Sequence, residues 1–186
     1  MQLKKLTFID MGREGAIYKI RDGLVMKITS RVPLFYYKAL NKNIDGCVRI
    51  YAIGTINPPK KFLSDLKISK MISGSEDRLY YVIMEELYTS EYFNNEVTKI
   101  FKTVTYPSYL KYMRNDIKED VDISIYDGLV TAIDNVSTLI DYSNMDIHSA
   151  NFMYDRDGNV RYTDLGSLLT KFMDFKPLIG KTYITD

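Results

Sequence analysis

The sequence predicts an α+β fold, with an antiparallel sheet in the N-terminal half and mainly helices in the C-terminal half. Two Asp-Gly pairs, Asp22-Gly23 and Asp157-Gly158, each separate short strand-like runs. This pair favours a β-hairpin because glycine adopts positive φ without steric cost. Apolar residues from Ile125 to Ile140 recur at helical spacing, which predicts a buried helix. At 186 residues we expect one domain, or two small lobes that share a cleft.

The expected elements follow the chain in order. Strands are expected at Leu3 to Ile9, at the run ending near Ile20, and at Leu24 to Ile28, Cys47 to Ile56 and Arg78 to Leu87, with a helix at Val32 to Asn43. Lys60 to Ser73 fits either a short helix or a strand. Tyr88 to Asp122 is polar, and its end, Lys111 to Asp122, is expected to be a solvated helix or loop. A helix at Ser124 to Tyr142 and short strands at Phe152 to Tyr154 and Val160 to Tyr162 complete the prediction.

Composition argues against several classes of function. The net charge of +1 implies no strong attraction to nucleic acid or to a membrane surface, so neither is expected as a partner. The single cysteine, Cys47, cannot form an internal disulfide, fits a reducing cytoplasm, and is expected to be buried. One histidine and one cysteine argue against a zinc site. We find no apolar stretch of bilayer-spanning length and no signal-peptide core.

The stretch from Asn144 to Gly166 contains the densest set of candidate ligands. Asn151 follows Asp146 after four intervening residues, and Asp164 follows the predicted hairpin. The hairpin would fold Asp164 back beside Asn151, so that two carboxylates and an amide converge. Magnesium prefers such oxygen ligands, completed by phosphate and water. An Asp-Gly hairpin between acids also occurs on ordinary surfaces, so the magnesium hypothesis depends on the full set of spacings.

Two N-terminal features point to a phosphate site. Gly12 and Gly15 precede an alternating strand, and missing side chains let backbone N–H groups approach an anion. Lys27 lies on an apolar strand one hairpin later, where a fixed cation can reach phosphates. The alternatives are an ordinary glycine turn and a solvent-facing lysine on an edge strand. The order of the two features favours the phosphate role for Lys27.

These motifs resemble those of the protein-kinase-like superfamily. Asp146 and Asn151 match the D-x-x-x-x-N catalytic loop, Asp164-Leu165-Gly166 resembles D-F-G, and the strand ending in Lys27 resembles V-A-I-K. The form Asp146 to Asn151 looks like that of the early serine/threonine protein kinases of short-tailed, autographivirus-type phages. The resemblance covers roughly Leu6 to Gly166.

The resemblance implies a minimal kinase-like fold, with an N-terminal lobe at 1–87 and a truncated, mainly helical lobe at 88–186. It implies ATP and Mg²⁺ as cofactors. The implied site residues are Gly12, Gly15 and Lys27 at the phosphates, Met84 behind the adenine, the backbone of Glu85 to Leu87 at its edge, Asn151 and Asp164 on magnesium, Asp146 at the substrate hydroxyl, and His148 bracing the loop. The implied partners are host proteins, such as RNA polymerase or other transcription or defence factors, in the host bacterial cytoplasm.

The sequence also departs from the kinase pattern. No acid lies between Arg31 and Ile44, so the expected helix has no Glu to pair with Lys27, and Asp10 replaces the first glycine. Only 20 residues follow Gly166, so we expect no activation segment. These departures favour one alternative, a pseudokinase that binds and inhibits a host factor. A second is a small-molecule phosphotransferase of the aminoglycoside type, which shares D-x-H-x-x-N but usually has a larger, acid-rich substrate lobe.

Overall fold

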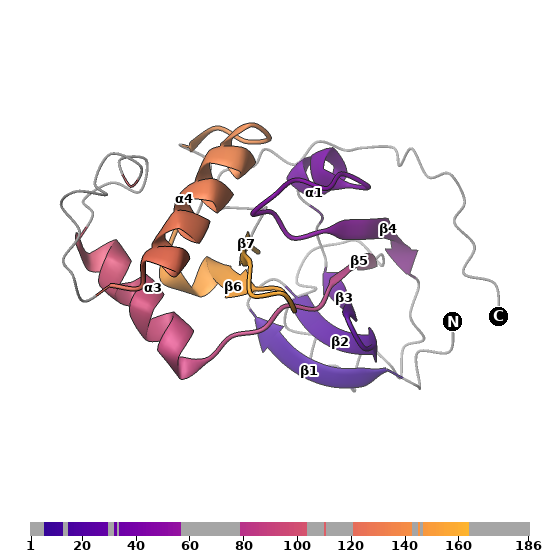
Figure 1. Ribbon diagram of the computed structural model, residues 1–186. Coiled ribbons are helices and arrows are strands. Elements are labelled where there is room, and N and C mark those ends of the chain that lie inside the picture. Colours follow the sequence, from indigo (N-terminus) through magenta and orange to yellow (C-terminus); the bar gives the residue numbers. More distant parts are fainter. Residues whose placement is uncertain are drawn as a thin grey trace.

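The computed structural model describes residues 6–12, 15–29, 32, 34–56, 79–103, 110, 121–142, 145 and 147–163. Its fold is α+β, as predicted, with a five-stranded antiparallel sheet, a two-stranded sheet and several helices (Figure 1). The strands are β1 (Thr7–Gly12), β2 (Gly15–Arg21), β3 (Leu24–Thr29), β4 (Ile50–Ile56), β5 (Leu79–Glu85), β6 (Phe152–Tyr154) and β7 (Val160–Tyr162). The helices are α1 (Leu34–Ala39), α3 (Glu91–Thr103) and α4 (Ile123–Ser137), with a 3₁₀ turn η5 (Ser149–Asn151).

The large sheet has the order β1-β2-β3-β5-β4, so β5 lies between β3 and β4. Both hairpins predicted from Asp-Gly pairs are confirmed. Gly23 and Gly158 have φ values of 76° and 86°, in the left-handed region that favours glycine. These turns set the register of β2 with β3 and of β6 with β7.

The two faces of the large sheet contact different cores. Val25 of β3 and Val82 and Met84 of β5 are buried in the main core, together with residues of α1, α3 and α4. Met26 and Ile28 point to the opposite face, where a smaller cluster forms. This alternation follows from the two-residue period of a strand, and it places Lys27 on the same face as Val25.

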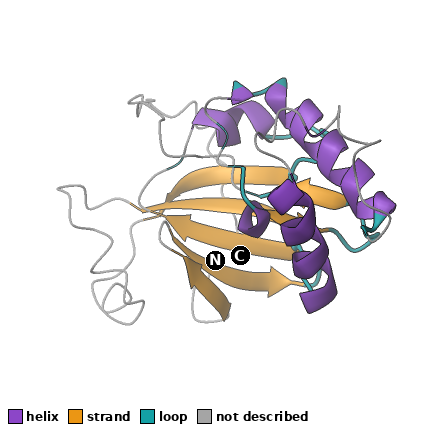
Figure 2. Ribbon diagram, turned by 90° about the vertical axis from the view of Figure 1, so that its left-hand side faces the viewer, coloured by secondary structure: helices purple, strands orange, loops and turns teal. Residues whose placement is uncertain are grey.

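The β6–β7 hairpin lies between the helices α3 and α4 and the five-stranded sheet (Figure 1). In the turned view, the helices gather along one side of the sheet (Figure 2). Backbone hydrogen bonds fix the hairpin to the sheet half: Tyr88 and Tyr154 exchange a pair of 2.8 and 2.9 Å, and the Val48 N–H donates to the Tyr162 carbonyl at 3.1 Å. None of the described helices has the length and apolarity that crossing a bilayer requires.

Contacts between segments correct the bounds of two predicted elements. The helix expected at Val32 to Asn43 covers only Leu34–Ala39, because Leu40 leaves it to form a parallel bridge with Ile50. The strand expected from Cys47 begins at Ile50, since Cys47 pairs with Tyr162 of β7 instead.

The polar segment after Tyr88, for which no element was predicted before Lys111, contains the 13-residue helix α3. The segments Lys60 to Ser73 and 111–120, whose structure the sequence left open, lie outside the described residues.

Candidate functional site

Lys27 occupies the centre of β3, opposite Val82 of β5. Its ammonium group donates a hydrogen bond to the Tyr36 hydroxyl at 3.2 Å and lies 5.5 Å from the centre of the Tyr36 ring. Tyr36 belongs to α1 and is 1% exposed. The described structure therefore directs Lys27 toward α1 and away from the solvent-facing orientation that was the alternative.

The hairpin returns the chain to Asn151. The Asn151 carbonyl accepts hydrogen bonds from the Thr163 N–H at 2.9 Å and from the Thr163 hydroxyl at 3.2 Å. Asn151 is buried at the end of η5, immediately before β6. The backbone thus reaches Asn151 at Thr163, while Asp164, which the sequence predicts beside Asn151, lies outside the described residues.

The loop before β6 is anchored on both sides of position 146. Met145 is buried and its N–H donates to the Tyr142 carbonyl at 3.1 Å, while Ile147 packs against the main core. His148 is exposed, and its carbonyl accepts the Asn151 N–H at 3.0 Å. Asp146, the predicted base, lies outside the described residues.

The two predicted glycines close the first hairpin of the sheet. Gly12 ends β1, Gly15 begins β2, and the two are direct partners in the ladder. The two residues between them lie outside the described residues. Gly15 pairs on its other side with Thr29, so this end of β2 lies two residues along β3 from Lys27.

The backbone that is expected to bind the edge of adenine, Glu85 to Leu87, is only partly available to a ligand. Met84 is buried opposite Val25, on the face of Lys27. However, the Glu85 N–H donates to the Arg49 carbonyl at 3.0 Å, and the Glu86 N–H donates to the Gly23 carbonyl at 3.1 Å. Both N–H donors are used within the protein, so neither is free to bind a ligand. Leu87 is the expected position whose N–H makes no hydrogen bond to the described residues.

A cluster of charged side chains around the buried Arg161, which includes Glu85 at the end of β5, was not predicted. Arg161 of β7 is 3% exposed and donates to Asp155 through Nε at 3.0 Å and Nη2 at 2.6 Å. Its Nη1 donates to Asp45 at 3.2 Å, and its Nε lies 3.8 Å from the Glu85 carboxylate. A charged residue at the centre of a short apolar strand is the signal that could have revealed it.

Within this cluster, the pKa values of Glu85 and Asp155 are shifted in opposite directions. Burial raises the pKa of Glu85, and the Arg49 N–H and the charge of Arg161 only partly oppose the rise. Burial also acts to raise the pKa of Asp155, but hydrogen bonds from Asn159 and Arg161 outweigh it and hold the pKa below its usual range. Cys47 is buried as predicted, and burial raises its thiol pKa to about 12.

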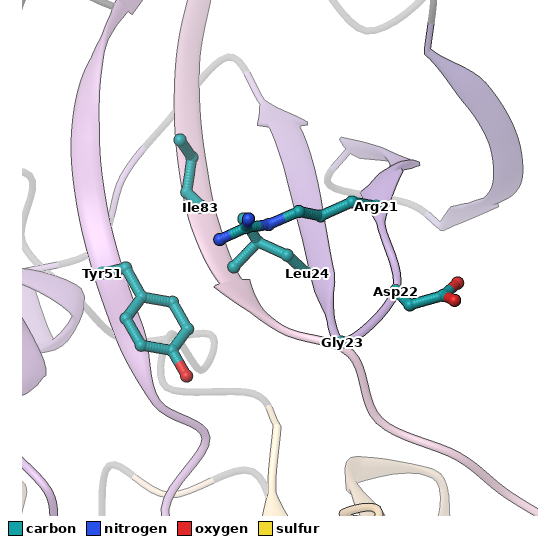
Figure 3. Close-up of a pocket in the computed structure, with 6 residues that line it drawn as sticks. All are labelled: Arg21, Asp22, Gly23, Leu24, Tyr51 and Ile83. Carbon is teal, nitrogen blue, oxygen red and sulfur yellow. The ribbon is translucent and has the colours of Figure 1, made fainter.

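Two surface hollows in the described part of the chain lie away from the predicted site. One, of about 460 Å³, is lined by Arg21, Asp22, Gly23, Leu24, Tyr51 and Ile83. In it, Arg21 extends across Leu24 toward the strand of Ile83, while Asp22 points away (Figure 3). Leu24 and Ile83 alternate with Val25 and Val82, so this hollow opens on the face opposite Lys27.

The other hollow, of about 530 Å³, lies among α3, α4 and the β6–β7 turn, with Tyr92, Asp127 and Asn159 in its wall. Within the described ranges, no three His, Cys, Asp or Glu side chains are grouped to hold a metal ion. No family model and no curated protein matches the sequence. The function must therefore be inferred from the residues of the candidate site.

Proposed function

We propose that the chain is a protein-kinase-like phosphotransferase of the phage type, which transfers the γ-phosphate of ATP to serine or threonine hydroxyls of host proteins. The main support is the closure of the hairpin on Asn151, because Thr163, the residue before Asp164 in the sequence, donates two hydrogen bonds to the Asn151 carbonyl. The sheet order and the inward direction of Lys27 add to it. The likeness to kinases rests on the motifs and on this arrangement.

The residues fit a magnesium-bound triphosphate in their chemistry. Asn151 supplies an amide oxygen and Asp164 a carboxylate, which are ligands that magnesium accepts. Bound magnesium would neutralise charge on the phosphates. Lys27 orients the phosphates, and Asp146 accepts or orients the proton of the substrate hydroxyl. The Met84 side chain closes the apolar end of the adenine site, while the Leu87 N–H is a donor for its edge.

Radiolabel transfer tests the proposal. The purified chain is incubated with γ-labelled ATP, Mg²⁺ and a bacterial lysate, beside the variants Asp146→Ala and Asp157→Ala. We expect labelled proteins, a loss of about 100-fold or more for Asp146→Ala, since a general base contributes that much, and normal transfer for Asp157→Ala. Asp157 is a matched control because it is an exposed acid in the β6–β7 turn.

Each other outcome would indicate a different function for this chain. Label on small molecules would replace the protein kinase with a small-molecule phosphotransferase. Nucleotide binding without transfer would favour the pseudokinase that inhibits a host factor. Full activity of Asp146→Ala would show that another group acts on the hydroxyl.

A further inference from the structure

One contact of the Lys27 amine is with a neutral side chain, Tyr36 of α1. The Tyr36 hydroxyl accepts its hydrogen bond at 3.2 Å, and the ring face lies 5.5 Å from the nitrogen, within the range of a cation–π contact. The sequence from Arg31 to Ile44 contains no carboxylate. A helix carboxylate therefore cannot orient Lys27 from α1.

The position of Tyr36 is itself fixed. Its ring is buried in the main core with Ala39 of the same helix and Val82 of β5. The neighbouring Lys38 donates from α1 to the Leu139 carbonyl at 3.2 Å, just beyond the end of α4. A hydroxyl on a buried, rigid ring directs the flexible lysine side chain at little entropic cost, because the ring has few rotamers to lose.

A phenol and a carboxylate differ in what they leave for a ligand. A carboxylate would orient the ammonium group and also neutralise it. The Tyr36 hydroxyl orients the same group but adds no negative charge of its own that would repel a phosphate. The missing acid is then compatible with a working phosphate site.

We propose that Tyr36 is a positioning residue that aims Lys27 at the diphosphate of a bound nucleotide, in place of a helix carboxylate. This inference rests on the proposed function, since it requires a nucleotide at Lys27. It assigns Tyr36 an effect on phosphate recognition but none on recognition of the base.

Tyr36→Phe tests this role because it removes the hydroxyl and keeps the buried ring. Affinities for ADP and for adenosine are measured by calorimetry on the full chain. We expect Tyr36→Phe to bind ADP about tenfold more weakly, the usual effect of losing a hydrogen bond to a charged group, with adenosine binding unchanged. A general loss of structure would weaken both ligands and lower the melting temperature.

Tyr37→Phe is the matched control. Tyr37 is the next residue of α1, is only half-buried, and projects about 100° away around the helix. Its substitution should change neither affinity. In addition, the nitrogen NMR signal of the Lys27 ammonium group should shift in Tyr36→Phe and stay unchanged in Tyr37→Phe, which tests the contact without any ligand.

The outcomes separate this inference from the proposed function. If the native chain binds neither ADP nor ATP, the proposed function fails, and the positioning role fails with it. If the native chain binds ADP more tightly than adenosine and Tyr36→Phe keeps that preference, only the role of Tyr36 is overturned. An unshifted Lys27 signal in Tyr36→Phe would also overturn it.

Discussion

Arg161 is a buried cation whose carboxylate partners come from three segments of the chain. Asp155 lies in the same hairpin, Glu85 ends β5, and Asp45 precedes β4. Removing a guanidinium group from water costs several kcal/mol, so the cation is tolerated there only while its partners remain ionised and well placed. Asp155 contributes most of the geometry, since it binds both Nε and Nη2.

We therefore expect Asp155→Asn to lower the free energy of unfolding by about 3 kcal/mol at neutral pH, because it leaves Arg161 short of a negative partner. The asparagine can keep the turn, since the Asp155 Oδ1 atom accepts the N–H groups of Asp157 and Asn159 at 2.9 Å each. Urea unfolding measures the change. Asp157→Asn, an exposed neighbour, should alter stability by less than about 0.5 kcal/mol.

The pH dependence of the free energy of unfolding provides a second test of the Asp155–Arg161 pair. The folded pKa of Asp155 lies below that of an unfolded aspartate, roughly 3.9. Its contribution is therefore complete above that value and is lost as the pH falls toward the folded pKa. Asp155→Asn should show less loss of stability than the native chain below about pH 4. Equal loss would mean that the Asp155–Arg161 pair does not stabilise the fold.

Sequence reasoning selected the candidate polar residues but could not predict the contacts that they make. Lys27 and Asn151 could be selected because strand order and loop spacing are local features. Tyr36 could not be predicted as a contact of Lys27, because kinases have an acid on this helix and a tyrosine in an apolar helix gives no sign of its partner. The contact depends on how α1 packs against β3, which spacing does not encode.

At the scale of elements, turn chemistry predicted the hairpins correctly, whereas the ends of helices and strands were not predicted correctly. The Asp-Gly pairs predicted two hairpins because glycine alone accepts the turn conformation cheaply. The early end of α1 depends on a bridge from Leu40 to Ile50, a contact between segments. Helix α3 was missed although Phe93, Val97 and Ile100 have helical spacing, because the buried Glu96 interrupts its apolar face.

The approach of α4 to the segment before β4 allows a sharp test of packing. Gly46 has a φ of 73°, and a Cβ there would lie 2.2 Å from the Cα of Ala132 in α4. We expect Gly46→Ala to cost about 3 kcal/mol or more, from backbone strain and from overpacking together. Chemical denaturation measures the loss.

Gly158→Ala supplies the matched control for this packing effect. Gly158 has a similar φ of 86°, but a Cβ there would meet nothing within 4 Å. Only the strain remains, so we expect a cost of about 1 kcal/mol. Equal costs at the two positions would mean that α4 does not approach Gly46 closely in solution.

At the scale of the molecule, the described sheet and helices share one main core. Val25 and Val82 of the sheet belong to the same buried cluster as Leu129 and Ile133 of α4. The β6–β7 hairpin strengthens this link, because Tyr162 donates to the Gly46 carbonyl at 2.7 Å and accepts from Val48. The sheet half therefore loses backbone partners whenever the hairpin opens.

This coupling predicts one cooperative unfolding transition. Far-ultraviolet circular dichroism follows the helices and strands, and tyrosine fluorescence follows packing, since the chain has 16 tyrosines and no tryptophan. The two thermal curves should coincide, and the calorimetric and van't Hoff enthalpies should agree. Asp155→Asn should move both curves by the same amount, because Asp155 holds Arg161 of the hairpin, which in turn lies beside Glu85 of β5. Separate transitions, or a shift in one probe alone, would mean that the two halves unfold independently.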